Sequence, residues 1–176
     1  MTDAIHIRRV LAFDEREIRE LGDVLIDCVE GGASVNFMLP MTRHKADAFW
    51  SNVAASARCG ERVVLAAEQG GVIVGTAQVI WAPQENQPHR GELAKMLVHR
   101  RARRQGLGAM LLAAAEQVAR DAGKTLLVLD TASDDAERLY ARAGWQRCGV
   151  IPGYALWPAG GPVATTVFFK SLAGVQ

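Results

Sequence analysis

ELAKMLVHRRARRQGLGA, at residues 92–109, contains a change of hydrophobic pattern from which the architecture can be inferred. Its beginning, Glu92 to Val98, is a short and mostly apolar run that predicts a buried strand. From Gly106 to Gly123, apolar residues recur every three or four positions, which predicts an amphipathic helix. A glycine-rich turn between a strand and a helix leaves backbone N–H groups unpaired where the helix dipole is positive. The stretch therefore predicts a strand, an anion-binding turn and a helix.

Three kinds of phosphate-binding turn occupy this position between a strand and a helix. The Walker loop ends in Gly-Lys-Ser/Thr, but Gly108 is followed by Ala109 and Met110, which excludes that loop. The dinucleotide fingerprint G-x-G-x-x-G lacks its third glycine, because Leu111 stands there, although Asp130 lies near where a ribose-binding acid would be. A nicotinamide-binding oxidoreductase of the Rossmann type therefore stays open as an alternative.

The third kind of turn is Arg/Gln-x-x-Gly-x-Gly/Ala, which RRQGLG at residues 103–108 matches in full. With KMLV at 95–98 before it, and AERLY at 136–140 and Gly144-Trp145 after it, the chain resembles the GNAT acetyltransferases over nearly its whole length. One departure is Ser133, where the family often has an asparagine. The resemblance implies acetyl-coenzyme A as the cosubstrate, bound by Met96, Leu97, Val98, Arg103, Arg104, Gln105, Gly106, Leu107, Gly108 and Ala109.

The rest of the pattern predicts a single domain, residues 1–176, of the mixed α/β class. The resemblance implies the GNAT fold, a central mixed and twisted sheet of about seven strands flanked by about four helices. The loop at residues 31–38 has neither a helical nor a strand period, and it is a candidate substrate lid. Strands are expected near 5–10, 62–68, 72–81, 92–98, 125–130, 146–156 and 163–170, and helices near 14–30, 42–58, 106–122 and 134–143. Asp14 is the expected N-cap of the first helix.

Charge and cysteine usage restrict the partners. Acidic and basic residues number 19 and 20, so no global field would draw the chain to nucleic acid or to an anionic membrane. The three cysteines, Cys28, Cys59 and Cys148, are far apart, and the four histidines lack the spacing of a metal site. We therefore expect a cytoplasmic protein with reduced thiols and without metal, nucleic-acid or membrane partners. Whether it forms a homodimer stays open.

Acetyl transfer from a thioester to an amine requires a base for the ammonium and a proton for the departing thiolate. Glu92 and Asp130 are the two candidates for the base. The alternatives are that Glu92 is a solvated strand-end acid and that Asp130 caps the short helix after it. The resemblance places Tyr140 where the family has the acid that protonates the coenzyme A sulfur, although core packing is the alternative. We expect direct attack in a ternary complex.

The acceptor is inferred from resemblance alone. GGASV at residues 31–35 and the tail at 152–154 and 166–172 look like the tabtoxin-resistance acetyltransferase group, which acts on a β-lactam amino acid toxin. This implies a small-molecule amine as partner, with an amino-acid-like toxin or antibiotic as the finer expectation. A lysine or N-terminal amine of a protein is the alternative. Residues that could line the pocket, or equally be scaffold, are Asn36, Arg43, Trp81 and Tyr154.

Overall fold

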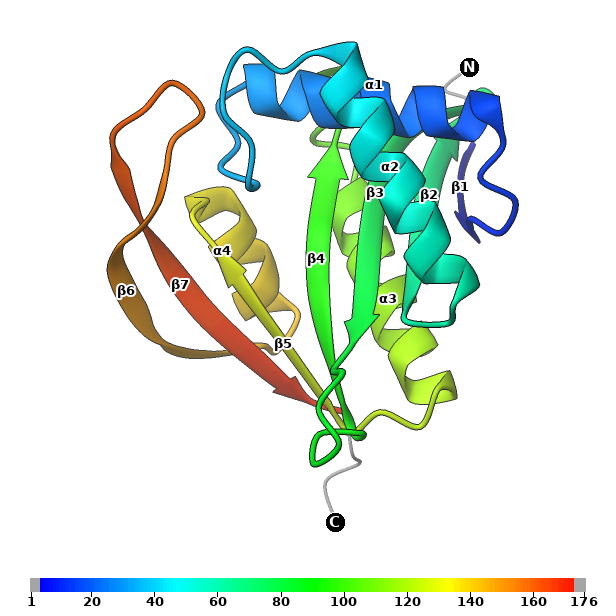
Figure 1. The fold of residues 1–176 in the computed structure, drawn as a ribbon. Coiled ribbons are helices and arrows are strands. Elements are labelled where there is room, and N and C mark those ends of the chain that lie inside the picture. The colour runs from blue at the N-terminus through cyan, green and yellow to red at the C-terminus, as the bar shows by residue number, and fades with distance from the viewer. Residues whose placement is uncertain (1–3, 173–176) are drawn as a thin grey trace.

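The computed structural model describes residues 4–172 and has one seven-stranded sheet with helices on both faces (Figure 1). Across the sheet the strand order is β1-β2-β3-β4-β5-β7-β6. The elements are β1 (Ile5–Arg9), α1 (Glu15–Glu30), α2 (Arg43–Arg58), β2 (Arg62–Gln69), β3 (Val72–Trp81), β4 (Arg90–Val98), the 3-10 turn η1 (Arg100–Ala102), α3 (Leu107–Asp121), β5 (Leu126–Thr131), α4 (Asp134–Arg142), β6 (Gln146–Leu156) and β7 (Pro162–Ser171). The expected mixed sheet and helices are confirmed.

Only β4 and β5 run parallel, while the other neighbouring pairs in the described part of the sheet are antiparallel. A dinucleotide-binding fold needs successive parallel strands joined by helices, so the oxidoreductase alternative is wrong for this chain. Pairing between β4 and β5 extends only from Arg90–Leu126 to Glu92–Val128. Beyond Glu92 the two strands separate, as Figure 1 shows, and their facing backbone groups have no sheet partner.

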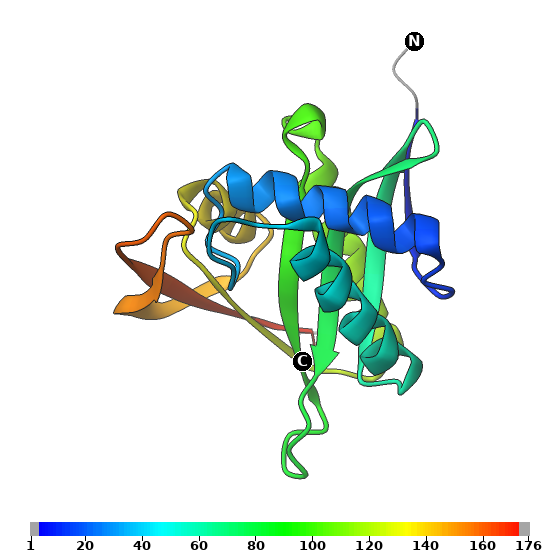
Figure 2. The ribbon, with the colours of Figure 1, turned by 45° about the horizontal axis from the view of Figure 1, so that its top comes forward.

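The two faces of the sheet carry separate apolar cores. Figure 2 shows α1 and α2 on one side of the sheet and α3 on the other. Trp50, Leu21 and Leu25 are fully buried in the α1/α2 core, and Leu107 and Leu111 in the core beneath α3. Burying a leucine-sized side chain contributes about 1.5–3 kcal/mol. These cores hold the sheet between two rigid layers, so the divergence of β4 from β5 is fixed by packing on both sides.

Three of the four α-helices in the described part of the chain begin at a residue whose side chain accepts a backbone N–H. Asp14 caps α1 in a reciprocal capping box with Glu17, as the sequence predicted for its N-cap. Thr42 caps α2 and Ser133 caps α4 in the same way. Helix α3 differs, because its N-cap is Gly106 and no side chain bonds its first turn. The N–H groups at the start of α3 are therefore available to a ligand.

Strand β4 contains a β-bulge that the sequence pattern did not predict. Thr76 of β3 lies opposite Leu97, but Gln78 lies opposite Ala94, so one residue of β3 faces two of β4. Lys95 has a φ of 49°, in the left-handed region that non-glycine residues rarely adopt. A bulge re-aims the side chain of the extra residue, and here it breaks the alternation that would direct Lys95 into the α3 core.

Candidate active site

The turn between β4 and α3 positions its backbone through two residues with positive φ. Arg104 has a φ of 61° and Gly106 a φ of 80°. A side chain at position 106 would be strained by this conformation, even though no atom lies within 4 Å of the place where its Cβ would be. The combination of η1, this turn and the uncapped α3 presents the N–H groups of Leu107, Gly108 and Ala109 at the positive end of the helix dipole.

Gly108 is required by a close approach between helices. A Cβ atom at this position would lie 3.1 Å from Cδ2 of Leu139 on α4, which is tighter than ordinary van der Waals contact. The absence of a side chain at Gly108 therefore lets α4 approach the first turn of α3. The open space at the start of α3 is at Gly106 instead, where no atom lies within 4 Å of the Cβ position and a phosphate could come near the backbone.

The two arginines of the turn behave differently. Nε of Arg103 donates to the backbone carbonyl of Val98 at 3.1 Å, and the thiol of Cys28 donates to the same oxygen at 3.5 Å. Arg104 is exposed and has no hydrogen bond or ion pair among residues 4–172. Gln105 is held by the β2–β3 hairpin, because its Oε1 accepts from Nε2 of Gln69 at 3.0 Å. Arg104 is thus the turn's free cation within the described residues.

Asp27 of α1 anchors η1 and was not identified from the sequence. Its carboxylate accepts from the backbone N–H of Arg100 at 2.8 Å and from Nε of the same residue at 2.9 Å, and Nδ1 of His99 lies 3.6 Å away. Burial alone would raise the pKa of Asp27, but these two hydrogen bonds outweigh burial and hold the pKa below its ordinary value. The ionised carboxylate therefore ties α1 to the segment that leads into the turn.

Glu92 and Asp130 lie on the same face of the sheet. Glu92 is level with Val128, and Asp130 is two residues further along β5, which is an offset of about 7 Å along the strand. Ala94 of β4, on the face of Glu92, is level with Gln78 of β3, which pairs in turn with Val64 of the α1/α2 core. Both acids therefore face the side that α1 and α2 cover, where β4 and β5 separate.

The two acids have different surroundings. Oδ2 of Asp130 accepts a hydrogen bond of 2.7 Å from the hydroxyl of Thr165 on β7. Asp130 does not cap α4, because Ser133 does, so the capping alternative for this acid is wrong. Glu92 is exposed, and its carboxylate has no hydrogen bond or ion pair with another residue in the range 4–172.

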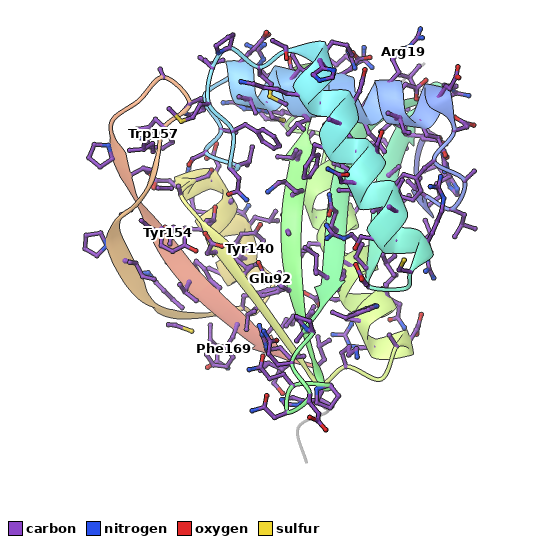
Figure 3. The ribbon with its side chains drawn as sticks, in the orientation of Figure 1. Arg19, Glu92, Tyr140, Tyr154, Trp157 and Phe169 are labelled. Carbon is purple, nitrogen blue, oxygen red and sulfur yellow. The ribbon has the colours of Figure 1, made fainter. Side chains whose placement is uncertain are left out.

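Tyr140 lies on the other face, packed against aromatic neighbours. Its side chain is only 5% exposed, and its ring centroid is 5.8 Å from that of Trp145 and 5.9 Å from that of Phe168. Burial and the nearby charge of Asp130 both raise the pKa of Tyr140 above its ordinary value. The phenol therefore stays protonated at neutral pH and close enough to Asp130 to feel its charge. Figure 3 labels Tyr140 and Glu92, which project onto the region where β4 and β5 separate.

The loop between α1 and α2 contacts the β6–β7 hairpin. The hydroxyl of Ser34 donates to the carbonyl of Leu156 at 3.1 Å, and the backbone N–H of Leu39 donates to the carbonyl of Pro158 at 2.9 Å. Phe37 of the loop packs edge-to-face on Phe49 of α2, with ring centroids 5.2 Å apart. The loop is thus held at both of its sides, by the hairpin and by α2.

Of the four residues considered for the acceptor pocket, Arg43 and Trp81 have their contacts in other parts of the structure. Arg43 bonds the carbonyl of Arg19 and pairs with Asp23 at the exposed α1–α2 contact. Trp81 packs with the α3 core and lies under the ammonium of Lys124. Tyr154 is 56% exposed on the β6–β7 hairpin, where Figure 3 labels it below Trp157.

Residues 36–145, more than half of the chain, match the acetyltransferase (GNAT) family. The chain belongs to the GNAT acetyltransferase family. It is 28% identical over 169 residues to an uncharacterized N-acetyltransferase of the hisH-hisA intergenic region of Azospirillum brasilense, covering 92% of this chain and 96% of that protein. As a GNAT enzyme it is an N-acetyltransferase that uses acetyl-coenzyme A as cosubstrate.

Two solved structures show the same GNAT fold. A proposed acetyltransferase from Salmonella typhimurium with its cofactor acetyl-CoA has a TM-score of 0.78 and 21% identity, covering 98% of this chain and 96% of the other. A GNAT superfamily phosphinothricin acetyltransferase from Sinorhizobium meliloti in complex with acetyl-CoA has a TM-score of 0.79 and 15% identity, covering 98% and 92%.

The residues around the turn fit the coenzyme of a GNAT enzyme. The uncapped first turn of α3 and the open space at Gly106 suit a pyrophosphate, and Arg104 of the same turn supplies a free cation. The N–H of His99 bonds Val74 of β3, so the backbone N–H of the preceding residue, Val98, points away from β3 to the side where β5 has separated. The carbonyl of Val98 already accepts from Arg103 and Cys28. An extended pantetheine arm could pair there as an added strand.

Other site types receive no support from the described residues. Between residues 4 and 172, no group of three or more His, Cys, Asp and Glu side chains is arranged to hold a metal ion. In the same part of the chain, no helix has the length and apolar character needed to cross a membrane.

Proposed function

We propose that the protein transfers the acetyl group of acetyl-coenzyme A to the amine of a small molecule, and that the acceptor is an amino-acid-like toxin or antibiotic. The observation that carries this proposal is the closed lid: the hydrogen bonds of Ser34 and Leu39 join the α1–α2 loop to the β6–β7 hairpin. We infer that the bridge between these two segments closes the acceptor side to an extended peptide. A small amine needs no open groove.

Two likenesses support the amino-acid-like acceptor. The GGASV sequence at residues 31–35 and the tail at 152–154 and 166–172 resemble the tabtoxin-resistance group, and Ser34 of the first stretch makes the lid contact. The phosphinothricin acetyltransferase of similar fold is named for an acceptor of the same kind. A protein acceptor is the alternative, because a ribosomal-protein-alanine N-acetyltransferase from Brucella melitensis also has this fold, with a TM-score of 0.77.

For the donor, we assign the pyrophosphate to the backbone N–H groups of Leu107, Gly108 and Ala109 and to the guanidinium of Arg104. Arg103 contributes the guanidinium nitrogens that its bond to Val98 leaves free. The pantetheine arm pairs with backbone groups of Met96 and Val98. The remaining members of the proposed set, Leu97, Gln105 and Gly106, shape this surface by packing, by the bond to the β2–β3 hairpin and by the left-handed turn.

The chemistry assigned to the side chains follows from their charges. Glu92 or Asp130, directly or through a water, removes a proton from the acceptor ammonium, because only the neutral amine has a free electron pair. The amine nitrogen then bonds to the acetyl carbon while the carbon–sulfur bond breaks, and the nitrogen releases its second proton to solvent as the neutral amide forms. Tyr140, which burial and Asp130 keep protonated, donates its hydroxyl proton toward the departing thiolate. We propose direct transfer in a ternary complex.

Thiol release from acetyl-coenzyme A tests the proposal. The panel comprises amino acids, their sulfone, sulfoximine and phosphinate analogues, polyamines, and peptides with lysine or N-terminal alanine. Rapid turnover with small amines, and none with peptides, is the expected result. Turnover confined to peptides would replace the small-molecule proposal. If none of the acceptors causes thiol release although the coenzyme binds, the result would count against both the small-molecule and the peptide acceptor.

We further propose a homodimer that forms through β6. This strand is at the edge of the sheet, and its side chains Val150, Ile151, Tyr154 and Leu156 are exposed apolar groups. Exposed apolar residues on an edge strand, whose outer side has no neighbouring strand, favour association with another copy. Sedimentation equilibrium should give twice the 19.0 kDa mass, and Ile151→Lys should give the monomer. A monomeric wild type contradicts the proposal.

We place the protein in the cytoplasm. Cys59 and Cys148 are exposed thiols without a disulfide partner among the described residues. Exposed free thiols persist in a reducing compartment. Fractionation of the host cell with an antibody against the chain checks this assignment, and recovery from an oxidising compartment would contradict it.

A further inference from the structure

Lys95 reaches the acceptor face because of the bulge in β4. Its ammonium lies over the ring of Phe49 of α2, 5.8 Å from the centroid. Strict alternation after Leu93, whose side chain is in the α3 core, would have placed Lys95 in that core too. The bulge, with its positive φ at Lys95, instead brings this side chain to the face that carries Glu92 and Asp130.

The ammonium of Lys95 lacks a close counter-ion. The side chain is partly buried, yet among residues 4–172 no carboxylate lies within ion-pair distance of its Nζ and no acceptor bonds it. Burial lowers its pKa, and the more distant charges of Asp130 and Glu92 offset this only in part. A buried ammonium without a partner is costly, so its retention on this face requires a reason.

A second buried donor on the same face also lacks a partner. Gln78 is 1% exposed and lies opposite Ala94, the residue next to Lys95. Its Oε1 accepts a hydrogen bond of 3.0 Å from Arg62, but its Nε2 has no acceptor among the described residues. Because buried amide groups are nearly always satisfied, an acceptor atom is missing on this face of the sheet. An oxyanion bound on this face would supply acceptors for both Lys95 and Gln78.

We infer that Lys95, with the amide of Gln78 on the same face, binds the oxyanion of a zwitterionic acceptor whose amine faces Glu92 and Asp130. The oxyanion is a carboxylate or a phosphinate. This inference rests on the proposed function and narrows its substrate class to amines that carry an anionic group. Lys95 is thereby a residue that determines acceptor specificity, and its role is separate from proton transfer.

The charges on this face favour a zwitterion over simpler ligands. A plain ammonium would be drawn to Glu92 and Asp130, but Lys95 would repel it. A plain anion would be drawn to Lys95 and repelled by both acids. A molecule with one ammonium and one oxyanion matches both signs, and binding it supplies the counter-ion that Lys95 lacks.

The experiment compares matched acceptors in wild type and Lys95→Met. Each L-amino acid is assayed beside its amide and beside the amine that decarboxylation leaves. The amide has the less basic amine, so chemical reactivity alone favours it, and a preference for the acid reports binding of the carboxylate. In wild type we expect kcat/KM for the best acid to exceed that for its amide about 10- to 100-fold. Lys95→Met should abolish this ratio and leave the KM for acetyl-coenzyme A unchanged.

Two further variants separate specificity from folding. Lys95→Arg keeps the charge and should retain part of the preference for acids. Lys124→Met is the matched control, because Lys124 also lies over an aromatic ring, 5.1 Å from the centroid of Trp81, but on the α3 face. The control should keep the wild-type ratio. Binding of acetyl-coenzyme A by every variant, measured by calorimetry, shows that the donor site is folded.

The outcomes distinguish the inference from the proposed function. Transfer to amides and plain amines as fast as to acids, or an unchanged ratio in Lys95→Met, would overturn the inference and leave a small-amine acetyltransferase. Transfer to no member of the panel, with acetyl-coenzyme A bound, would overturn both together.

Discussion

In the donor half of the site, one continuous segment, residues 92–109, supplies a strand edge, a turn and a helix start, and its ligand groups are mostly backbone N–H and C=O. In the acceptor half, single side chains come from β3, β4, β5 and the lid, which are distant in sequence. Backbone geometry depends on a few glycines and on local pattern, whereas the acceptor half depends on where separate strands meet. The donor could therefore be predicted from the motif, and the acceptor could not.

The largest effect is expected where the two halves meet, at Glu92. Glu92→Gln keeps the shape of the side chain and removes the base, so kcat should fall by about 10²–10⁴. The KM for acetyl-coenzyme A should not change, because the donor half is intact. Steady-state thiol release measures both. Glu85→Gln, in the exposed loop before β4, is the control.

Unchanged turnover in Glu92→Gln would remove Glu92 from the mechanism and leave Asp130 as the base. Asp130→Asn would then carry the loss instead. Because Asp130 also accepts a hydrogen bond from Thr165, the variant Thr165→Val shows how much of any loss comes from positioning of the carboxylate.

The donor half is tested most directly at Gly108. Gly108→Val introduces atoms where even a Cβ lies 3.1 Å from Leu139, so α4 and the start of α3 must move apart. We expect the Kd for acetyl-coenzyme A to rise about 10- to 100-fold in calorimetry. Gly149→Val on β6 is the control, since no atom lies within 4 Å of its Cβ position. Equal affinity in both variants would show that the turn does not bind the coenzyme.

The same contrast explains how much the sequence could predict. The strands, the four helices and the N-cap Asp14 follow from local periodicity and were predicted within one or two residues. The bulge at Lys95 could not be predicted, because no glycine or asparagine marks its positive φ. That Trp81 packs with α3 and that Arg43 pairs with Asp23 depend on contacts between distant segments, which local patterns do not encode.

A substitution at Tyr140 tests whether the buried phenol takes part in the reaction or only packs in the apolar core. Tyr140→Phe keeps the ring contacts to Trp145 and Phe168 and removes the hydroxyl, and kcat should fall about tenfold if the phenol donates a proton. The raised pKa keeps the phenol protonated up to about pH 10, so this deficit should be constant from about pH 7 to about 9.5 in thiol-release assays. Equal turnover of the two proteins would assign Tyr140 to packing alone.

The smallest expected effect tests how far the donor half depends on the rest of the fold. Asp27→Asn keeps an acceptor for the backbone N–H of Arg100 but loses the negative charge that holds the guanidinium of Arg100. The segment η1 and the turn at residues 103–108 should therefore become less ordered. We expect the KM for acetyl-coenzyme A to rise about three- to fivefold with kcat unchanged. Asp23→Asn, one turn earlier on α1 and paired with Arg43, is the control.

The pH dependence of the KM for acetyl-coenzyme A distinguishes an effect of the Asp27 carboxylate from an effect of His99. The pKa of Asp27 is held below its ordinary value of about 3.9, so its contribution is present above that pH and is lost only as pH falls through the lower, folded-state value. The KM ratio of Asp27→Asn to wild type should therefore be flat between about pH 6 and 8. A ratio that changes across this range would assign the anchoring to His99, whose imidazole faces Asp27 and the N–H of Arg101, instead of to the carboxylate.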